Sequence, residues 1–353
     1  MNFEQTMLQK ELSVIPTQLS FLGIIDLRGT DHFKKDKTLH KSLRAGDEGQ
    51  KKVVSYLKKY GRSHWTVLQN VWLDDFGTFE NDLILITRHA IYVLEIKNYT
   101  GTFTYDEGKC FYNNFESSVN PIEQVRVCKV NLQNILSRES QNIPVKSAVI
   151  FTGDDNDVLI KSNVGEIDVV RRTQILKYIR QIVDEENSNR SSRLDESEII
   201  QSLAPYEIPN PYTPAPLTDE EMKHIVGGIY CVNCLSFEVK MNKMWVTCLC
   251  GFKEPREEAV IRTICEYGVL TFSRNLKRKE LQKFLGKDCS IGLLKSVLYR
   301  HFEANDNFSH TTYKNKNQIY SKVSDHFKIN KKQVYKPNPN QVVYLRNNRI
   351  TML

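Results

Sequence analysis

The chain has 353 residues and a mass of 41.1 kDa, which is too long for one ordinary domain, so two or three domains are expected. Its 40% hydrophobic and 26% charged residues exclude a collagen-like or fully disordered chain. No apolar run is long enough to span a membrane, and the start, MNFEQTMLQKELSVIP, lacks the basic and apolar regions of a signal peptide. We therefore expect a cytoplasmic protein.

The net charge of +7 is unevenly distributed. Residues 221–353 hold 23 Lys and Arg against 11 Asp and Glu, a balance of +12, whereas the rest of the chain has a balance of −5. A polyanionic partner for the C-terminal part is consistent with this asymmetry, although a solvated basic face is the commoner cause.

After an N-terminal extension over residues 1–39, the segment 40–203 has the pattern of one α/β domain with a mixed sheet. A helix is predicted in GDEGQKKVVSYLKKYG, and a second in NPIEQVRVCKVNLQNIL with Asn120 as its N-cap. Between and after them we expect strands, and a third helix in TQILKYIRQIVDEE. The expected strands cover 65–74, 81–87, 90–98, 101–105 and 145–151, and the segment EIDVVR.

A linker follows, because residues 204–221 hold five of the eleven prolines. Beyond it we expect a small cysteine-rich domain over 222–253, a helical domain over 254–310, and a basic tail or wing over 311–353. Helices are predicted over Glu254–Tyr267, Arg278–Leu285 and Ile291–Phe302.

Two apolar strands in ENDLILITRHAIYVLEIK carry Asp82, Glu95 and Lys97. If the hairpin turn is centred on Arg88 and His89, Asp82 lies opposite Glu95 with Cβ atoms about 5 Å apart. Lys97, two residues beyond Glu95, then faces the same side of the sheet.

Two neighbouring carboxylates repel each other, and a divalent cation such as Mg²⁺ removes that conflict. Such a metal activates water, and a lysine beside it stabilises charge on a phosphoryl oxygen, which is the chemistry of phosphodiester hydrolysis. The alternative is a buried ion pair between Glu95 and Lys97, with Asp82 capping the strand end.

Asp82 followed by Glu95-Ile96-Lys97 resembles the core of PD-(D/E)xK nucleases. The surroundings resemble the nuclease-related domain (NERD) family more narrowly: AGDEGQKKVVSYL resembles its first helix, ENDLILITRHAIYVLEIKNYTGTF its central hairpin, and NPIEQ its later helix start. The resemblance covers about residues 40–185 and implies a restriction-endonuclease-like fold. Asn81, where PD-(D/E)xK enzymes have proline, is one departure.

The resemblance also implies residue roles. Asp82 and Glu95 would bind Mg²⁺ or Mn²⁺, and Lys97 would be the catalytic lysine. Glu48 would approach the metal directly or through water, and Gln124 would orient the lysine, the water or a phosphate. As alternatives, Glu48 is an acid favoured by the helix dipole, and Gln124 is a solvent-facing helical residue.

Cys231, Cys234, Cys248 and Cys250 have the spacing of a structural zinc site, because two turns can present four thiolates to one tetrahedral ion. The pattern resembles a zinc ribbon whose hairpin turns near Asn242, although the second pair is CxC rather than CxxC. His224 is a possible substitute ligand. The other four cysteines are expected to be buried thiols.

The segment FSRNLKRKELQKFLGKDCSIGLLKSVLYRHF predicts two helices joined by a glycine turn, as in a helix-turn-helix or winged-helix unit, with HTTYKNKNQIYSKV as a possible wing. The alternative is a small helical packing module with a solvated basic face. The residues expected to contact nucleic-acid phosphates are Arg274, Lys277, Arg278, Lys279, Lys283, Lys287, Lys295 and Arg300.

Together these patterns predict a metal-dependent nuclease, with DNA as the expected substrate and C-terminal modules that hold nucleic acid. No phosphate-binding loop, HExxH motif or GxSxG motif is present. One alternative is a nucleic-acid-binding protein with a degenerate nuclease scaffold. Another is a protein-interaction module in a defence or repair complex.

Overall fold

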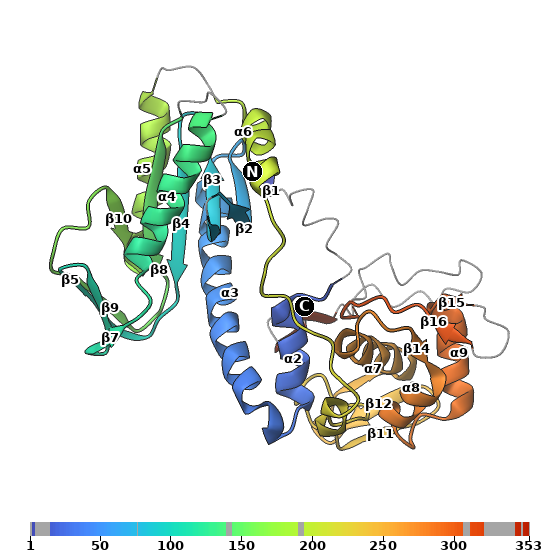
Figure 1. Ribbon diagram of the computed structural model, residues 1–353. Helices are drawn as coiled ribbons and strands as arrows, with labels where there is room; N and C mark the ends of the chain where they lie inside the picture. The colour runs from blue at the N-terminus through green and yellow to red at the C-terminus, as the bar shows by residue number, and fades with distance from the viewer. Residues whose placement is uncertain are drawn as a thin grey trace. The chain divides into compact units, whose positions relative to one another are not determined.

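The computed structural model describes residues 15–75, 77–138, 143–189, 194–305 and 311–320, together with the backbone of three short strand regions, 2–3, 343–346 and 349–352. The chain forms two compact units (Figure 1). Unit 1 contains Met1–Leu12 and Arg44–Pro211, and unit 2 contains Ser13–Leu43 and Tyr212–Leu353.

Unit 1 is built on a six-stranded sheet with the strand order β1-β2-β3-β4-β8-β10. Neighbours among β2, β3 and β4 are antiparallel, whereas β8 is parallel to both β4 and β10, and β1 is parallel to β2. The predicted α/β pattern with a mixed sheet is thus confirmed. The strands are β1 (Asn2–Phe3), β2 (Thr66–Asp74), β3 (Thr78–Ile86), β4 (Ile91–Lys97), β8 (Val145–Phe151) and β10 (Ile167–Val170).

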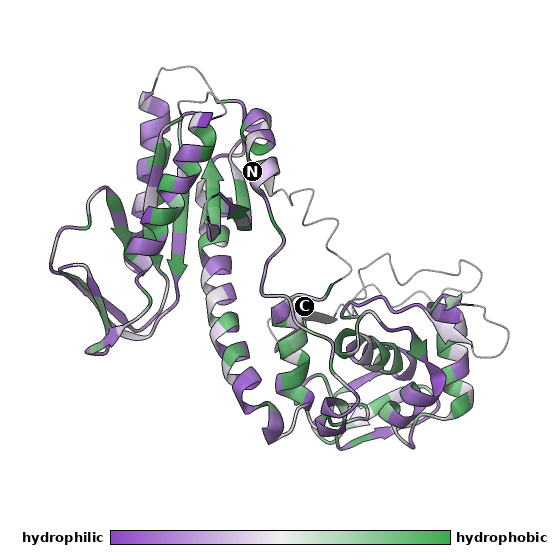
Figure 2. Ribbon diagram, viewed as in Figure 1, coloured by the Kyte–Doolittle hydropathy of each residue, from purple (hydrophilic) through white to green (hydrophobic). Residues whose placement is uncertain are grey.

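Helices cover both faces of this sheet, so each face has its own hydrophobic core. Helices α3 (Lys34–Tyr60) and α5 (Ile175–Ser188) pack on the face that carries Leu83, Leu94 and Ile96. The opposite face, which carries Ile84 and Val93, packs against α4 (Pro121–Arg138) and α6 (Glu196–Leu203). Figure 2 shows the apolar residues concentrated in these central strands. Since side chains alternate along a strand, Glu95 and Lys97 belong to the α4 face.

The α4 helix begins where the sequence predicts, at Pro121. The Asn120 side-chain oxygen accepts hydrogen bonds from the backbone N–H groups of Ile122 and Glu123, which is the expected N-cap. A second sheet follows β4 in the chain and has the strand order β7-β6-β5-β9. Its strands are β5 (Gly101–Asp106), β6 (Lys109–Tyr112), β7 (Phe115–Ser117) and β9 (Asn156–Ile160).

The N-terminal extension expected over residues 1–39 is divided between the two units. Residues 13–43 pack with unit 2, which contains α2 (Gln18–Arg28). The first helix expected from Gly46 starts at Lys34 instead, because the polar segment before Gly46 contains no proline and continues the helix. Helix α3 therefore contributes residues to both units.

Unit 2 contains two small three-stranded sheets and three further helices. The first sheet, β11-β12-β13, is antiparallel and carries the cysteine cluster. The second sheet has the strand order β14-β16-β15. Along the chain its strands and the helices follow the order α7-β14-α8-α9-β15-β16. The strands are β11 (Val239–Met241), β12 (Trp245–Cys248), β13 (Lys253–Pro255), β14 (Leu276–Lys277), β15 (Ala304–Asn305) and β16 (Thr312–Tyr313).

The three helices of unit 2 lie close to their predicted positions: α7 (Arg256–Leu270), α8 (Arg278–Leu285) and α9 (Ile291–His301). Of the expected tail or wing over 311–353, residues 311–320 and strands β17 (Val343–Arg346) and β18 (Arg349–Met352) are described. The rest of that prediction lies outside the described residues. Short 3-10 helices occupy Asp31–Phe33, Arg172–Gln174, Ala204–Tyr206 and Glu221–His224.

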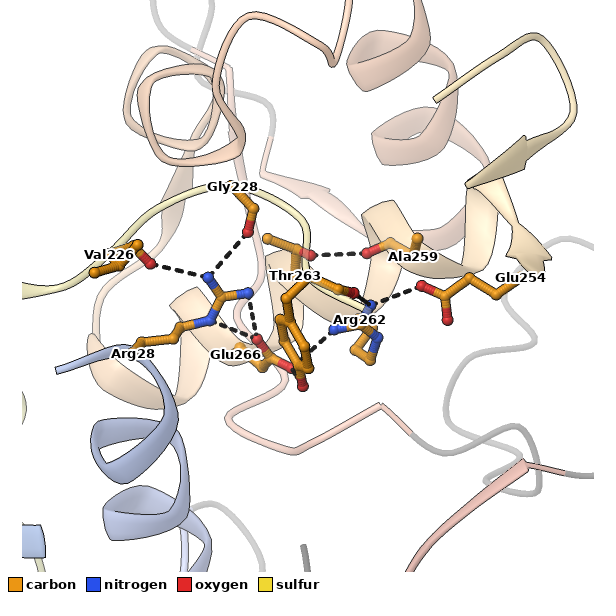
Figure 3. Close-up of polar contacts among 9 residues, drawn as sticks. Arg28, Val226, Gly228, Glu254, Ala259, Arg262, Thr263 and Glu266 are labelled. Carbon is orange, nitrogen blue, oxygen red and sulfur yellow. Dashed lines mark hydrogen bonds and ion pairs between the residues drawn. The ribbon is translucent and has the colours of Figure 1, made fainter. Parts of the chain in front are cut away.

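A buried charge network joins α2 to the rest of unit 2 (Figure 3). Arg28 forms an ion pair with Glu266 at 2.7 Å and donates to the carbonyl oxygens of Val226 and Gly228. Arg262 pairs with Glu254 at 2.7 Å and with Glu266 at 3.4 Å. Because both arginines face carboxylates in the protein interior, the network connects α2 to the rest of unit 2.

Within the described parts of the chain, no helix is both long enough and apolar enough to cross a membrane.

Candidate functional site

The β3–β4 hairpin has the register that the sequence predicts. Ile86 pairs with Ile91 and Leu83 with Leu94, which centres the turn on Arg88 and His89. The ladder ends at the Leu83–Leu94 pair, however, so the direct pairing expected between Asp82 and Glu95 does not form.

The strands open at Asp82, and its carboxylate occupies the opening. Its Oδ2 atom accepts a hydrogen bond from the backbone N–H of Ile96 at 2.7 Å. Its Oδ1 atom accepts one from the side chain of Gln50, on α3, at 3.0 Å. On the other side of β3 the ladder is interrupted at Asn70, whose φ of 52° is left-handed. Asp82 is thus held between α3 and the backbone of β4.

Glu95 and Lys97 form the second part of the site. The Lys97 Nζ atom lies 2.7 Å from Glu95 Oε1, and both side chains are largely buried. Burial, together with the negative charge of Asp82, raises the pKa of Glu95 to about 7. Burial alone would lower the pKa of Lys97, but the charge of Glu95 and the bond to it raise that pKa overall. Burial also raises the pKa of Asp82, in spite of the bond from Ile96.

Glu80 is a member of this cluster that the sequence reasoning missed. Burial raises its pKa to about 7, and the charges of Asp82 and Glu95 contribute to that rise. The available signal was the spacing of two residues between Glu80 and Asp82, which places both on one face of β3. The cluster therefore brings three carboxylates together with one lysine.

The donor set fits a hard divalent cation. Three carboxylates beside one ammonium group leave an excess of negative charge, and the raised carboxylate pKa values show that burial disfavours this charge. Mg²⁺ and similar ions bind oxygen ligands from one or two carboxylates and offset such charge. Among the described residues, the group of potential ligand atoms that lies close enough together to hold a metal is the cysteine set of unit 2, so a cation at the acidic cluster stays a prediction.

Glu48 and Gln124 are less closely associated with the cluster. Glu48 accepts a hydrogen bond from Arg44 at 3.1 Å on the α3 surface, whereas Gln50 is the α3 residue that reaches Asp82. Positions two apart on a helix point to nearly opposite sides, which explains the difference. Gln124 is exposed, and its side chain makes no hydrogen bond within the described residues. It lies one turn before Cys128, whose Sγ donates to the Glu80 carbonyl oxygen at 3.1 Å.

Close packing fixes the end of β4 that carries Lys97. A Cβ atom added at Gly49 of α3 would lie 2.8 Å from the Thr152 hydroxyl and 2.9 Å from Asn98 Cβ. Asn98 also donates a hydrogen bond to the Ala45 carbonyl oxygen at 2.8 Å. Glycine at position 49 therefore allows α3 to lie directly against the residue after Lys97.

The four predicted cysteine ligands come together in unit 2. Their sulfur atoms all lie within 4.8 Å of one another; Cys231 and Cys250 are 3.6 Å apart, and Cys234 and Cys248 are 3.5 Å apart. Tetrahedral zinc with Zn–S bonds of 2.3 Å places sulfurs about 3.8 Å apart, so the set fits such an ion.

The surroundings of the cluster favour a thiolate at Cys250. Hydrogen bonds from the Phe252 backbone and the Asn233 side chain lower the pKa of Cys250 to about 6. His224, the possible substitute ligand, instead stacks on His32 with ring centroids 4.2 Å apart. The metal candidate is therefore the set of four cysteines.

The eight predicted phosphate-binding residues fall into two groups. Arg274, Lys277 and Arg300 are paired with Asp219, Glu280 and Glu257 at 2.7, 3.1 and 3.0 Å respectively. The other residues are exposed and have no ion-pair partner within the described residues. These are Arg278, Lys279, Lys283, Lys287 and Lys295.

The mixed α/β sheet of unit 1 is consistent with a nuclease-like fold. Residues 45–152 match the family model described as NERD, nuclease-related domain. The match covers less than a third of the chain, but it contains the whole acidic cluster. No curated protein and no solved structure matches the chain.

Proposed function

We propose that the chain is a metal-dependent nuclease that hydrolyses phosphodiester bonds, with DNA as its substrate and Mg²⁺ or Mn²⁺ as its cofactor. The observation that carries this proposal is the convergence of Glu80, Asp82, Glu95 and Lys97 where strands β3 and β4 separate. The nuclease-related match over the same residues supports it independently.

Asp82 and Glu95 are the proposed metal ligands, and Glu80 adds a third carboxylate to the same face. The bound ion would activate water and offset charge on a phosphoryl oxygen. Lys97, held 2.7 Å from Glu95, orients the attacking water and stabilises the charge that develops on the phosphate. Burial keeps bulk water from screening these interactions.

The supporting residues have different proposed roles. Gln50 holds Asp82 in the strand opening through its 3.0 Å hydrogen bond, which makes it a positioning residue. Glu48, which accepts a hydrogen bond from Arg44 on the α3 surface, is proposed to act on the metal through water. Gln124, which is exposed near the start of α4, is proposed to orient a phosphate.

The test compares the wild type with Lys97→Ala and Asp82→Ala on linear, circular and single-stranded DNA and on RNA, with Mg²⁺, Mn²⁺ or EDTA. We expect cleavage of DNA only with metal, and losses of at least about 100-fold in both variants. Lys146→Ala is the matched control, because Lys146 pairs with Glu185 outside the acidic cluster. This variant should cleave DNA like the wild type.

Two other outcomes overturn the proposal in different ways. If all variants bind nucleic acid equally and none cuts it, unit 1 is a non-catalytic scaffold. If the wild type shows no salt-dependent binding to nucleic acid, a protein-interaction module is the better interpretation.

For unit 2 we propose two nucleic-acid-binding modules. The antiparallel β11-β12-β13 sheet with four clustered cysteines supports a zinc ribbon with one structural Zn²⁺. The order α7-β14-α8-α9-β15-β16 supports a winged-helix unit, with the five unpaired cations available to phosphates.

Zinc content provides a direct test of the ribbon. Purified protein should hold one zinc ion per chain, and Cys248→Ser should lose it. Cys289→Ala is the control, since Cys289 is buried in unit 2 away from the cluster and should keep the metal. Full zinc content in Cys248→Ser would refute the proposed ligand set.

A further inference from the structure

One face of the β11-β12-β13 sheet is turned away from the core of unit 2. Val246 of β12 is buried in that core, and Glu254 of β13 pairs with Arg262 on α7. Figure 1 shows α7 lying next to this sheet. Because side chains alternate along a strand, the neighbours of these residues point to the opposite side. We call this side the ribbon face; it comprises Lys240, Trp245, Thr247 and Lys253.

Trp245 is the exceptional residue of the ribbon face. Its side chain is 37% exposed, whereas the other two tryptophans of the chain, Trp65 and Trp72, are 0% and 8% exposed. The backbone beneath it is fixed, because Asn242 accepts a hydrogen bond from Trp245 N–H and donates one to the Trp245 carbonyl oxygen. The indole is thus an exposed ring on a rigid turn.

Lysines surround this indole. Lys240 and Lys253 both pair with Thr247 in the sheet register, so their backbones lie on the two sides of β12, about 10 Å apart. Lys243 lies in the turn before Trp245. All three lysines lack an ion-pair partner within the described residues. Glu238, directly before β11, is an exposed acid close to them in the sequence. The face is therefore positively charged around one aromatic ring.

We propose that the ribbon face binds single-stranded nucleic acid, with one base stacked on Trp245 and phosphates held by Lys240, Lys243 and Lys253. An exposed ring combined with unpaired cations is the arrangement that binds single strands, because every unpaired base offers a face for stacking. A duplex does not offer one, since its bases are already stacked on each other. This site rests on the nucleic-acid binding proposed for unit 2 and specifies its ligand, and it does not depend on the hydrolysis proposed for unit 1.

The positions of the tryptophans allow a selective test. Full-length, zinc-loaded protein is titrated without added Mg²⁺ with an oligothymidylate of about 12 nucleotides. Trp65 and Trp72 are buried, and quenching that disappears in Trp245→Leu is assigned to Trp245. Affinity is measured in parallel by the anisotropy of a labelled oligonucleotide.

We expect saturable quenching in the wild type and about tenfold weaker binding in Trp245→Leu, with most of the affinity retained in Trp245→Phe, which keeps an aromatic ring. In the Lys240→Ala/Lys253→Ala pair, the negative slope of log K against log salt should become smaller in magnitude by up to about 1.4. The matched control, Lys177→Ala/Arg180→Ala, removes two exposed charges from α5 outside both proposed binding modules and should leave the quenching unchanged.

Three results would overturn the proposal: no quenching at saturation, unchanged affinity in Trp245→Leu, or equal competition by a duplex. Zinc content is measured for each variant, and Trp245→Phe decides the question if Trp245→Leu loses its metal. The cleavage assay is separate, so quenching without cleavage rejects only the nuclease, and cleavage without quenching rejects only the ribbon site.

Discussion

The two units each bury a cluster of charged side chains, and the clusters differ in their balance. In unit 2, Arg28 and Arg262 face Glu254 and Glu266, so two cations meet two anions. In unit 1, Lys97 is the one cation among Glu80, Asp82 and Glu95.

The pKa directions follow this difference. Burial alone would raise the pKa of Glu266, but Arg28 and Arg262 hold it below its ordinary value. In unit 1, burial and like charges raise the pKa of Glu80 and of Glu95 to about 7. Removing one partner from a balanced buried network is costly, whereas a group of buried like charges with raised pKa values is a candidate functional site. This contrast is why we propose a structural role for one cluster and a functional role for the other.

The largest expected effect is on activity, in Glu95→Gln. Cleavage should fall at least about 100-fold, because the variant removes the negative charge that holds the metal. The free energy of unfolding should change by less than about 3 kcal/mol, because two effects oppose each other: the fold disfavours the Glu95 charge, but Lys97 loses its ion-pair partner at 2.7 Å. The measurements are cleavage assays and urea unfolding in the presence of chelator. A loss of about 3–5 kcal/mol together with the activity would make the Glu95–Lys97 pair a structural ion pair instead.

In unit 2 the expected effect of removing a buried carboxylate is on stability rather than on activity. Glu266→Gln leaves Arg28 without its carboxylate partner and should destabilise unit 2 by about 3–5 kcal/mol. Hydrogen exchange of α7 peptides measures the loss. Glu220→Gln is the control, since Glu220 forms a surface pair with Lys223 and its loss should have no measurable effect. Equal exchange in the two variants would contradict a stabilising role for the network.

The same network predicts a pH dependence. Because the pKa of Glu266 is lower in the folded state, its contribution is fully present above the ordinary value of 4.5 and is lost as pH falls through the folded value. Acid should therefore weaken unit 2 below about pH 4.5, and Glu266→Gln should show a smaller change over that range. Thermal unfolding at a series of pH values tests this, and parallel curves for the two proteins would argue against it.

Local chemistry made much of the fold predictable from sequence. The Asn120 cap and Pro121 set the start of α4, and α8 has the predicted bounds because its apolar spacing ends at Gly286. The hairpin register also followed from the sequence, because two apolar strands with a short turn leave few alternatives.

Long-range contacts were not predictable. Arg28 and Glu266 are 238 residues apart, and no pattern in either segment indicates that α2 packs with unit 2. The opening of the strands at Asp82 depends on the φ of Asn70 and on Gln50 of α3, so it needs the assembled fold. Glu80, by contrast, could have been predicted, since its spacing of two residues from Asp82 is visible in the sequence.

The smallest expected change in stability comes from alanine substitutions at two glycines of α3 that are three residues apart. A Cβ at Gly46 would meet nothing within 4 Å, whereas one at Gly49 would overlap Thr152 and Asn98. Gly46→Ala should stabilise unit 1 by about 0.5–1 kcal/mol through helix propensity. Gly49→Ala gains the same propensity but should be destabilised overall by about 1–2 kcal/mol because of the overlap.

This pair also tests how packing supports the site. Asn98 directly follows Lys97, so a shift forced by Gly49→Ala moves the end of β4 that carries the proposed catalytic lysine. Gly49→Ala should therefore lose cleavage as well as stability, while Gly46→Ala keeps its activity. Urea unfolding and the cleavage assay on both variants provide the comparison. Normal cleavage in a destabilised Gly49→Ala would show that the lysine tolerates movement of α3, and that the acidic cluster is held by β3 and β4 alone.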